Sequence, residues 1–293
     1  MPPVTRRTLT LTAAVAVALM LASPALARVG PGTAALQIAL RDRGLYKGPL
    51  DGIRGAATVA AVMRLQRSTG VAATGRLDRR TRLALGRLGR HLPGTRTVTV
   101  GSSGWDVSWL EFMLAKHGFD PGRIDGRFDR RTKLAAVGFD RFAGISDRCH
   151  AHPNLFKALR RTPTQRSPLR LVWPVQATVA RGFGIQGARL YSGVKLAGGF
   201  GTAVASAAEG RVVFAGRKGS LGLVVELKHP HGVVTVYGHL GRIDVRLGDR
   251  VLRGALIGVL GKTGRTADPA LYFEVRVRGA AVDPIRALPN VET

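Results

Sequence analysis

The first group of side chains that could bind a metal ion lies in one short loop. Cys149, His150 and His152 supply a thiol and two imidazoles, a donor set that zinc accepts. No fourth donor is evident near them, so the loop does not by itself predict a metal centre. Because Cys149 is the only cysteine, the sequence excludes an internal disulfide and a Cys-rich zinc module.

The second group consists of histidines in the last third of the chain. His229 and His231 flank one turn, and His239 lies six residues beyond Val233 on the strand expected to return from that turn. A strand advances about 3.3 Å per residue, so His239 is expected roughly 20 Å from the turn. The three imidazoles therefore cannot share one ion.

Composition and charge narrow the class of protein. The length of 293 residues predicts two or three domains, and 45% apolar with 22% charged residues is typical of globular chains. Forty-five basic residues, 37 of them Arg, stand against 18 acidic ones, giving a net charge of +27. Such a field favours polyanions such as nucleic acid, anionic lipid or the acidic polymers of a bacterial wall.

The N-terminus has the pattern of a signal peptide over residues 1–27. Residues 1–7 carry two arginines, residues 9–21 are apolar, and residues 25–27 read Ala-Leu-Ala. The apolar run of about 13 residues is short for a membrane span of about 20, so we expect cleavage after residue 27 and no membrane anchor. The paired arginines also fit a twin-arginine signal, so both export routes stay open. We therefore expect an exported protein of the cell wall, periplasm or extracellular space, which does not bind nucleic acid.

Residues of the N-terminal half recur at a fixed offset of 74 without a gap. Leucines one helical turn apart, an Asp-Gly turn and a following Thr indicate helical units. Residues 78–88 add a third short helix to the first copy, whereas none is evident in the second. The recurring pairs are Leu36/Leu110, Leu40/Leu114, Gly44/Gly118, Asp51/Asp125, Gly52/Gly126, Thr58/Thr132, Ala61/Ala135 and Gly70/Gly144.

Each copy resembles the bacterial peptidoglycan-binding domain of the three-helix type. We place the first at 33–90, the second and divergent copy at 98–147, and a Pro-, Arg- and Thr-rich linker at 148–167. The second copy has Asp129 where the family has a second Gly, and Asp140 where Gln is usual. The resemblance implies that both copies bind peptidoglycan. The alternative is that the copies are generic helical spacers, and for the second copy that it is a degenerated spacer. The motif residues are Tyr46, Asp51, Gly52, Thr58, Gln66, Asp125, Gly126 and Thr132.

Residues 168–289 predict an antiparallel all-β domain, because short Val/Ile/Leu-rich runs alternate with glycines. The order of elements resembles the lysostaphin/LytM-type zinc metallopeptidase family, which cleaves peptidoglycan peptides. The fold class is thus two small all-α repeats followed by a LytM-type domain (duplicated hybrid motif). The matching landmarks include Trp173-Pro174, Gly201-Thr202, Glu209-Gly210, Tyr237-Gly238-His239, Gly258-Val259-Leu260-Gly261, Phe273-Glu274 and Asp283-Pro284.

The resemblance also implies where the zinc ligands would lie. The family uses a His-x-x-x-Asp pair and the second His of a His-x-His motif, with two further histidines assisting the metal-bound water. This chain has Tyr191 and Lys195 at the first two ligand positions and Tyr272 at the third. One assisting position is Ala270, and only His239 survives. The family's catalytic set is therefore not intact, and we expect no zinc.

Charge makes the loss of the metal site more severe. Lys195 would stand where a carboxylate should neutralise the ion, and charges of +1 and +2 about 3 Å apart repel by on the order of 10 kcal/mol at an effective dielectric of 20. We expect Tyr191, Lys195, Tyr272 and His239 to converge on the old metal pocket as a candidate binding cleft. The alternative is decay, with residues filling a hole that has no purpose.

These observations favour an exported peptidoglycan-binding protein with a catalytically degenerate domain. Its expected partners are peptidoglycan, anionic wall polymers and a wall amidase or other hydrolase that it regulates. The alternatives are a zinc-dependent peptidoglycan endopeptidase with an unconventional site, and purely structural anchoring. Ser192 lies near the cleft, but no His-Asp pair is evident beside it to make it a nucleophile.

Overall fold

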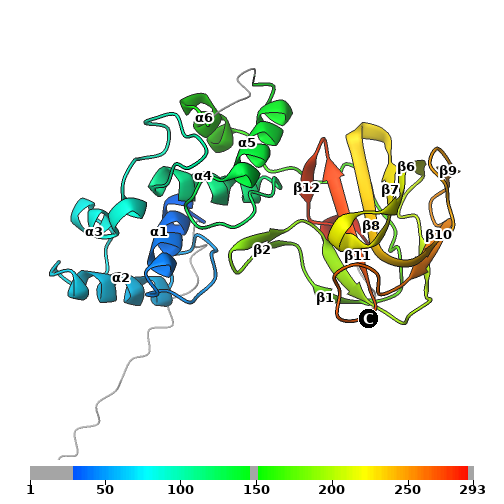
Figure 1. Ribbon diagram of the computed structural model, residues 1–293, viewed down its shortest axis with the longest axis horizontal. Helices are drawn as coiled ribbons and strands as arrows, with labels where there is room; N and C mark the ends of the chain where they lie inside the picture. Colours follow the sequence, from blue (N-terminus) through cyan, green and yellow to red (C-terminus); the bar gives the residue numbers. More distant parts are fainter. Residues whose placement is uncertain (1–28, 146–150, 290–293) are drawn as a thin grey trace, which may run out of the picture.

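The computed structural model describes residues 29–145 and 151–289. The expected signal peptide and Cys149 with His150 lie outside this range. Figure 1 shows a group of helices at one end and a β domain at the other. Within the described residues no helix is long and apolar enough to cross a bilayer. The helices are α1 Pro31–Asp42, α2 Ala56–Ser68, α3 Arg79–Ala84, α4 Trp105–Lys116, α5 Arg130–Ala143 and α6 Pro153–Arg161, with a 3-10 turn at Gly86–Gly89.

The helices repeat at the offset found in the sequence. Each of α4, α5 and α6 begins 74 residues after α1, α2 and α3, respectively. The prediction that the second copy lacks a third helix is therefore wrong, and the segment 148–167 is not simply a linker. In α6, Leu155, Phe156 and Leu159 are fully buried. Phe156 stacks on Trp109 of α4 at 5.6 Å, so α6 belongs to the helical core.

The C-terminal domain is antiparallel, as the sequence predicts. Its main sheet has the order β1-β4-β11-β8-β7-β6-β9, with β12 on β11 and β10 bridging β8 and β5; β2 and β3 form a separate hairpin. The strands are β1 Thr178–Arg181, β2 Gly184–Gln186, β3 Arg189–Tyr191, β4 Val194–Ala197, β5 Ala203–Ala205, β6 Gly210–Arg217, β7 Leu223–Lys228, β8 Val233–Ile243, β9 Arg250–Val251, β10 Leu256–Leu260, β11 Ala270–Val277 and β12 Ala280–Val282.

The long central strands bury a continuous apolar core. Tyr237, Phe273 and Leu227 on β8, β11 and β7 are fully buried, and the rings of Tyr237 and Phe273 lie 5.4 Å apart. Alternate side chains of a strand point to opposite faces, so the residues between these anchors face outward. Tyr272, next to Phe273, is placed in this way on the cleft face of β11.

The second repeat is fastened to the β domain through backbone contacts. The β2–β3 hairpin reaches toward the helices (Figure 1), and the Ile124 amide donates to the Ala188 carbonyl at 2.8 Å. The Ala281 amide in β12 donates to the Gly118 carbonyl at 3.0 Å. Leu190 of β3 is buried in the same apolar cluster as the helical repeats. The hairpin that carries Tyr191 is thus held by both halves of the chain.

Candidate functional site: the repeat turns and the LytM-type cleft

A buried glutamine organises the first repeat. The Gln37 side chain is fully buried in α1, and its Oε1 accepts the Gly52 amide at 2.9 Å. Its Nε2 lies 2.7 Å from Asp51 Oδ1, 3.2 Å from the Tyr46 hydroxyl and 3.3 Å from Thr58 Oγ1. Four residues of the peptidoglycan-binding motif therefore gather around one amide.

Gln66 organises the next turn of the first repeat, between α2 and α3, in the same way. It is fully buried in α2; its Oε1 accepts the Gly75 amide at 2.8 Å, and its Nε2 donates to Thr81 Oγ1 at 2.9 Å. Tyr46 and Thr58 are 4% and 1% exposed. These motif side chains point inward, so they build the repeat and do not present a surface to peptidoglycan.

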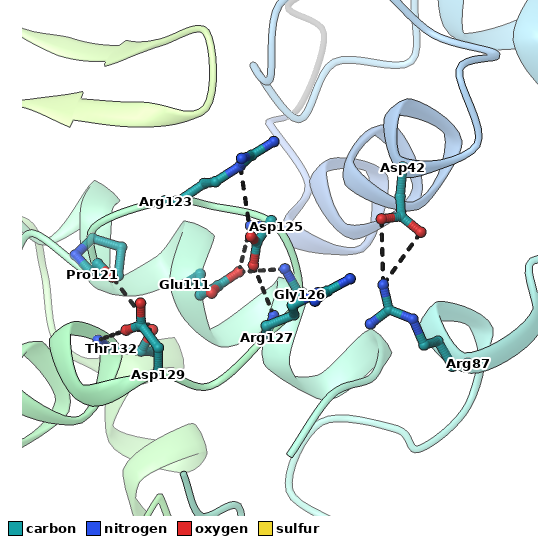
Figure 2. A network of polar contacts seen from close by, with 10 residues as sticks. All are labelled: Asp42, Arg87, Glu111, Pro121, Arg123, Asp125, Gly126, Arg127, Asp129 and Thr132. Atoms are coloured by element: carbon teal, nitrogen blue, oxygen red, sulfur yellow. Dashed lines mark hydrogen bonds and ion pairs between the residues drawn. The ribbon is translucent and has the colours of Figure 1, made fainter. Parts of the chain in front are cut away.

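The second repeat replaces both glutamines by acids at the same offset. Glu111 stands at the position of Gln37, and Asp140 at that of Gln66, and both are buried. Figure 2 shows Glu111 beneath the Asp125–Gly126 turn, where its Oε2 accepts the Asp125 and Gly126 amides at 3.0 and 2.7 Å. Its Oε1 is buried and has no hydrogen-bond partner among the described residues. The Asp129 side chain caps α5, because its Oδ1 accepts the Thr132 amide at 2.8 Å.

Glycine is required at both Asp-Gly turns. Gly52 and Gly126 have φ of +72° and +77°, the left-handed region that side chains disfavour. A Cβ on Gly126 would lie 2.5 Å from Ser108 Oγ, and one on Gly52 would lie 2.9 Å from the Gly30 carbonyl oxygen. The Asp-Gly pairs found in the sequence are therefore turn residues in both copies.

Substituting Glu111→Gln is expected to stabilise the protein above neutral pH. Burial raises the pKa of Glu111 well above its usual range, so the folded state holds a proton that the unfolded chain releases. The contribution of the protonated carboxyl to the free energy of unfolding is complete below the ordinary pKa of Glu. It falls as the pH rises toward the raised pKa of the folded state. A glutamine needs no proton, so unfolding in denaturant at pH 8 should cost about 1–3 kcal/mol more than in the wild type. At pH 4 the two should differ little; an equal gain at both pH values would contradict this assignment.

The residues of the candidate cleft line a single pocket of about 230 Å³. The structure brings Tyr191, Lys195, His239 and Tyr272 together there. Lys195 on β4 lies directly across from Tyr272 on β11 and from Arg181 on β1. The remaining lining residues are Arg181, Gly193, Val194, Ser220, Leu221 and Arg265.

Neither tyrosine offers an oxygen suited to a metal. The Tyr272 hydroxyl donates to Glu274 Oε2 at 2.8 Å, and burial together with that carboxylate raises the pKa of Tyr272 far above its usual value. Glu274 is 3% exposed and receives two bonds from Arg276, at 2.7 and 3.1 Å. The Tyr191 ring lies under the Arg181 guanidinium, 3.9 Å from centroid to Cζ, and its hydroxyl accepts a bond from the same group.

His239 is held as a neutral imidazole. Its Nδ1 lies 2.8 Å from the Thr263 carbonyl oxygen, which only accepts, so Nδ1 carries the proton. Burial, and then the charge of Lys195, lower the pKa of His239. The residue has a left-handed φ of +61° inside β8, which places its ring beside Tyr272 at a centroid distance of 6.3 Å. Its Nε2 is left as an acceptor.

The donor set of the cleft does not fit zinc. Ala270 is a fully buried aliphatic residue at one family position, and Lys195 places a positive charge where the ion would sit. Within the described residues, no three His, Cys, Asp or Glu side chains come together in a way that could hold a metal ion. His229 is occupied elsewhere, since its Nε2 lies 2.7 Å from Thr235 Oγ1 and its Nδ1 lies 2.6 Å from the Glu209 carbonyl oxygen.

Several residues of both sites escaped sequence reasoning. Gln37 and Glu111 are polar residues inside apolar helical runs at the repeat offset, which is a signal that the sequence does contain. Arg181 and Arg265 carry no such signal, because only strand pairing and the loop after β10 bring them to the cleft.

Comparison with known proteins identifies both parts. Residues 189–284 match the family described as "Peptidase family M23", and residues 29–85 match the family described as "Putative peptidoglycan binding domain". The DD-carboxypeptidase/endopeptidase Mpg of Neisseria meningitidis serogroup B is 41% identical over 36% of this chain and 24% of its own length. Murein hydrolase activator EnvC of Escherichia coli K12 is 35% identical over 38% of this chain and 27% of its own. Murein hydrolase activator NlpD of Salmonella typhimurium is 35% identical over 40% and 31%.

The matched segment spans less than a third of the length of these curated relatives. The match to peptidase family M23 covers most of the β domain that carries the cleft, whereas the match to the peptidoglycan-binding family covers the first repeat. The chain thus combines a peptidoglycan-binding domain with a LytM-type domain of peptidase family M23.

Proposed function

We propose that the protein is an exported, peptidoglycan-bound regulator of a cell-wall hydrolase, and that its LytM-type domain binds without cleaving. The observation that carries the proposal is the cleft itself. Lys195 lines the pocket together with Tyr191 and Tyr272, where the family's ligands would lie, and both phenols are engaged with Arg181 or Glu274. A domain of this fold without a metal donor set retains the shape of a binding groove.

The two relatives named murein hydrolase activators support a regulatory role for such a domain. We assign wall binding to the first repeat, because it is the copy that matches the peptidoglycan-binding family, whereas the second repeat is fastened to the β domain through Gly118 and Ile124. The net charge of +27 adds attraction to anionic wall polymers. Peptidoglycan, those polymers and a wall amidase are the partners that we assign.

The test is reconstitution with purified components. The mature chain is incubated with isolated sacculi, alone and with a wall amidase of the same cell, and released muropeptides are separated by chromatography. We expect no release by the chain alone, co-sedimentation with sacculi, and a rate of amidase release raised at least about tenfold. An unchanged amidase rate would refute the regulatory role.

The second candidate is a zinc-dependent peptidoglycan endopeptidase with an unconventional site. It is favoured by the identity of 41% to a DD-carboxypeptidase/endopeptidase. It requires donors that the cleft does not supply, so metal-dependent release of muropeptides by the chain alone is the result that would establish it.

A further inference from the structure

The cleft carries positive charge that nothing in its lining balances. Arg181, Lys195 and Arg265 line the pocket, and none of its lining residues is Asp or Glu. His239 adds no negative charge, and Ser220 contributes a neutral hydroxyl. A small pocket walled by one sign of charge concentrates the field inside it and attracts ions of the opposite sign.

Lys195 is the centre of this charge. It is half-buried on β4, and no ion pair or hydrogen bond joins it to another side chain in the described part of the chain. Its register partner on β1 is Arg181, and like charges directly opposite in a sheet are destabilising. Its other register partner, Tyr272, turns its hydroxyl to Glu274. An anion bound at the Lys195 ammonium would relieve this repulsion.

The acid on the same face cannot take that place. Glu274 is buried under two hydrogen bonds from Arg276 and one from the Tyr272 hydroxyl, so its charge is already compensated. Arg181 and Arg265 are exposed at the mouth of the pocket, where Arg181 lies on the Tyr191 ring. A guanidinium binds a carboxylate through two parallel bonds, which makes the pair specific as well as strong.

We propose that the vacated metal position has become a carboxylate site, in which Lys195, flanked by Arg181 and Arg265, binds the C-terminal carboxylate of a wall peptide. The pocket volume of about 230 Å³ fits a small C-terminal residue of a peptide, and it is too small for the surface of a folded protein that presents a long acidic side chain. His239 Nε2 accepts the amide N–H of that residue. The identity of the peptide rests on the proposed function, which places the chain on the wall; the carboxylate chemistry rests on the pocket.

The test compares two forms of one peptide. Acetyl-lysyl-D-alanyl-D-alanine with a free C-terminus, and the same peptide with a C-terminal amide, are titrated into the mature chain by calorimetry. We expect the acid to bind at least about tenfold tighter than the amide. In Lys195→Met the preference should disappear, whereas Lys195→Arg should keep most of it.

The matched control is Lys228→Met, which removes the same charge from the exposed far end of β7. It should keep the preference for the acid. Equal binding of acid and amide by the wild type, or an undiminished preference in Lys195→Met, would overturn the carboxylate site. Stimulation of the amidase is measured on the same proteins, so loss of the carboxylate preference with stimulation intact refutes this site alone and leaves the regulatory role standing.

Discussion

Returning the three altered positions to the family's ligands is expected to create a zinc site. In the variant Tyr191→His, Lys195→Asp, Tyr272→His, two imidazoles and a carboxylate replace the residues that line the pocket. Three N and O donors with one open position are what a hydrolytic zinc site needs. We expect one zinc per chain by mass spectrometry and a dissociation constant lower than that of the wild type by at least about three decades, since each tenfold corresponds to about 1.4 kcal/mol.

A second variant separates charge from ligand count. Tyr191→His with Tyr272→His keeps Lys195 and thus the repulsion on the ion, so it should bind zinc far more weakly than the triple variant. Equal affinity of the two variants would show that the Lys195 charge is not what excludes the metal. Stoichiometric zinc in the wild type would contradict the account of the site.

The largest expected effect on stability is at Gln37. Gln37→Leu leaves the buried Gly52 amide without its acceptor and removes the Nε2 donor from the Asp51 Oδ1 and Thr58 Oγ1 oxygens. Each buried group left unpaired costs about 1–3 kcal/mol, so we expect the free energy of unfolding of the helical part to fall by about 2–4 kcal/mol. Denaturant unfolding followed by circular dichroism measures the loss.

The control variant introduces glutamate, the residue type that the second repeat has at the equivalent position. Gln37→Glu preserves the acceptor for the Gly52 amide but adds a buried carboxylate, as at Glu111. Its loss should be small at pH 4 and grow as the pH rises, because the folded state must keep the carboxyl protonated. A loss from Gln37→Leu below about 0.5 kcal/mol would show that the amide does not hold the turn.

The sequence predicts the repeats well because their turn residues have strict backbone requirements. Gly52 and Gly126 need a left-handed φ, and the Asp-Gly pairs at an offset of 74 follow from it. The all-β class follows in the same way from short apolar runs between glycines. In each case a local rule and the global fold agree.

The third helix of the second repeat escaped prediction because its capping signal is gone, although a proline at its first position and apolar residues at helical spacing remain. In α3 the Asp78 side chain caps the helix by accepting the Thr81 amide, but the equivalent residues before and within α6 are His152 and Leu155. Short helices depend on tertiary burial more than on propensity. Here that burial comes from Leu155, Phe156 and Leu159.

Only the cleft residues that belong to the family's ordered motifs could be predicted from the sequence. Tyr191, Lys195 and Tyr272 follow from the order of the family's motifs, whereas Arg181 and Arg265 enter through strand pairing and a loop contact, the Arg265 amide donating to the Ser220 carbonyl at 2.7 Å. The engagement of Tyr272 with Glu274 depends on a shared strand face, which the sequence does contain as an i, i+2 pair.

The most direct test of the central claim is the zinc content of the purified mature protein, measured by mass spectrometry together with release of muropeptides from isolated sacculi. The structure predicts no stoichiometric zinc and no cleavage, because Lys195 and two engaged tyrosines occupy the ligand positions. One zinc per chain, with peptide-bond cleavage that a chelator abolishes, would contradict it.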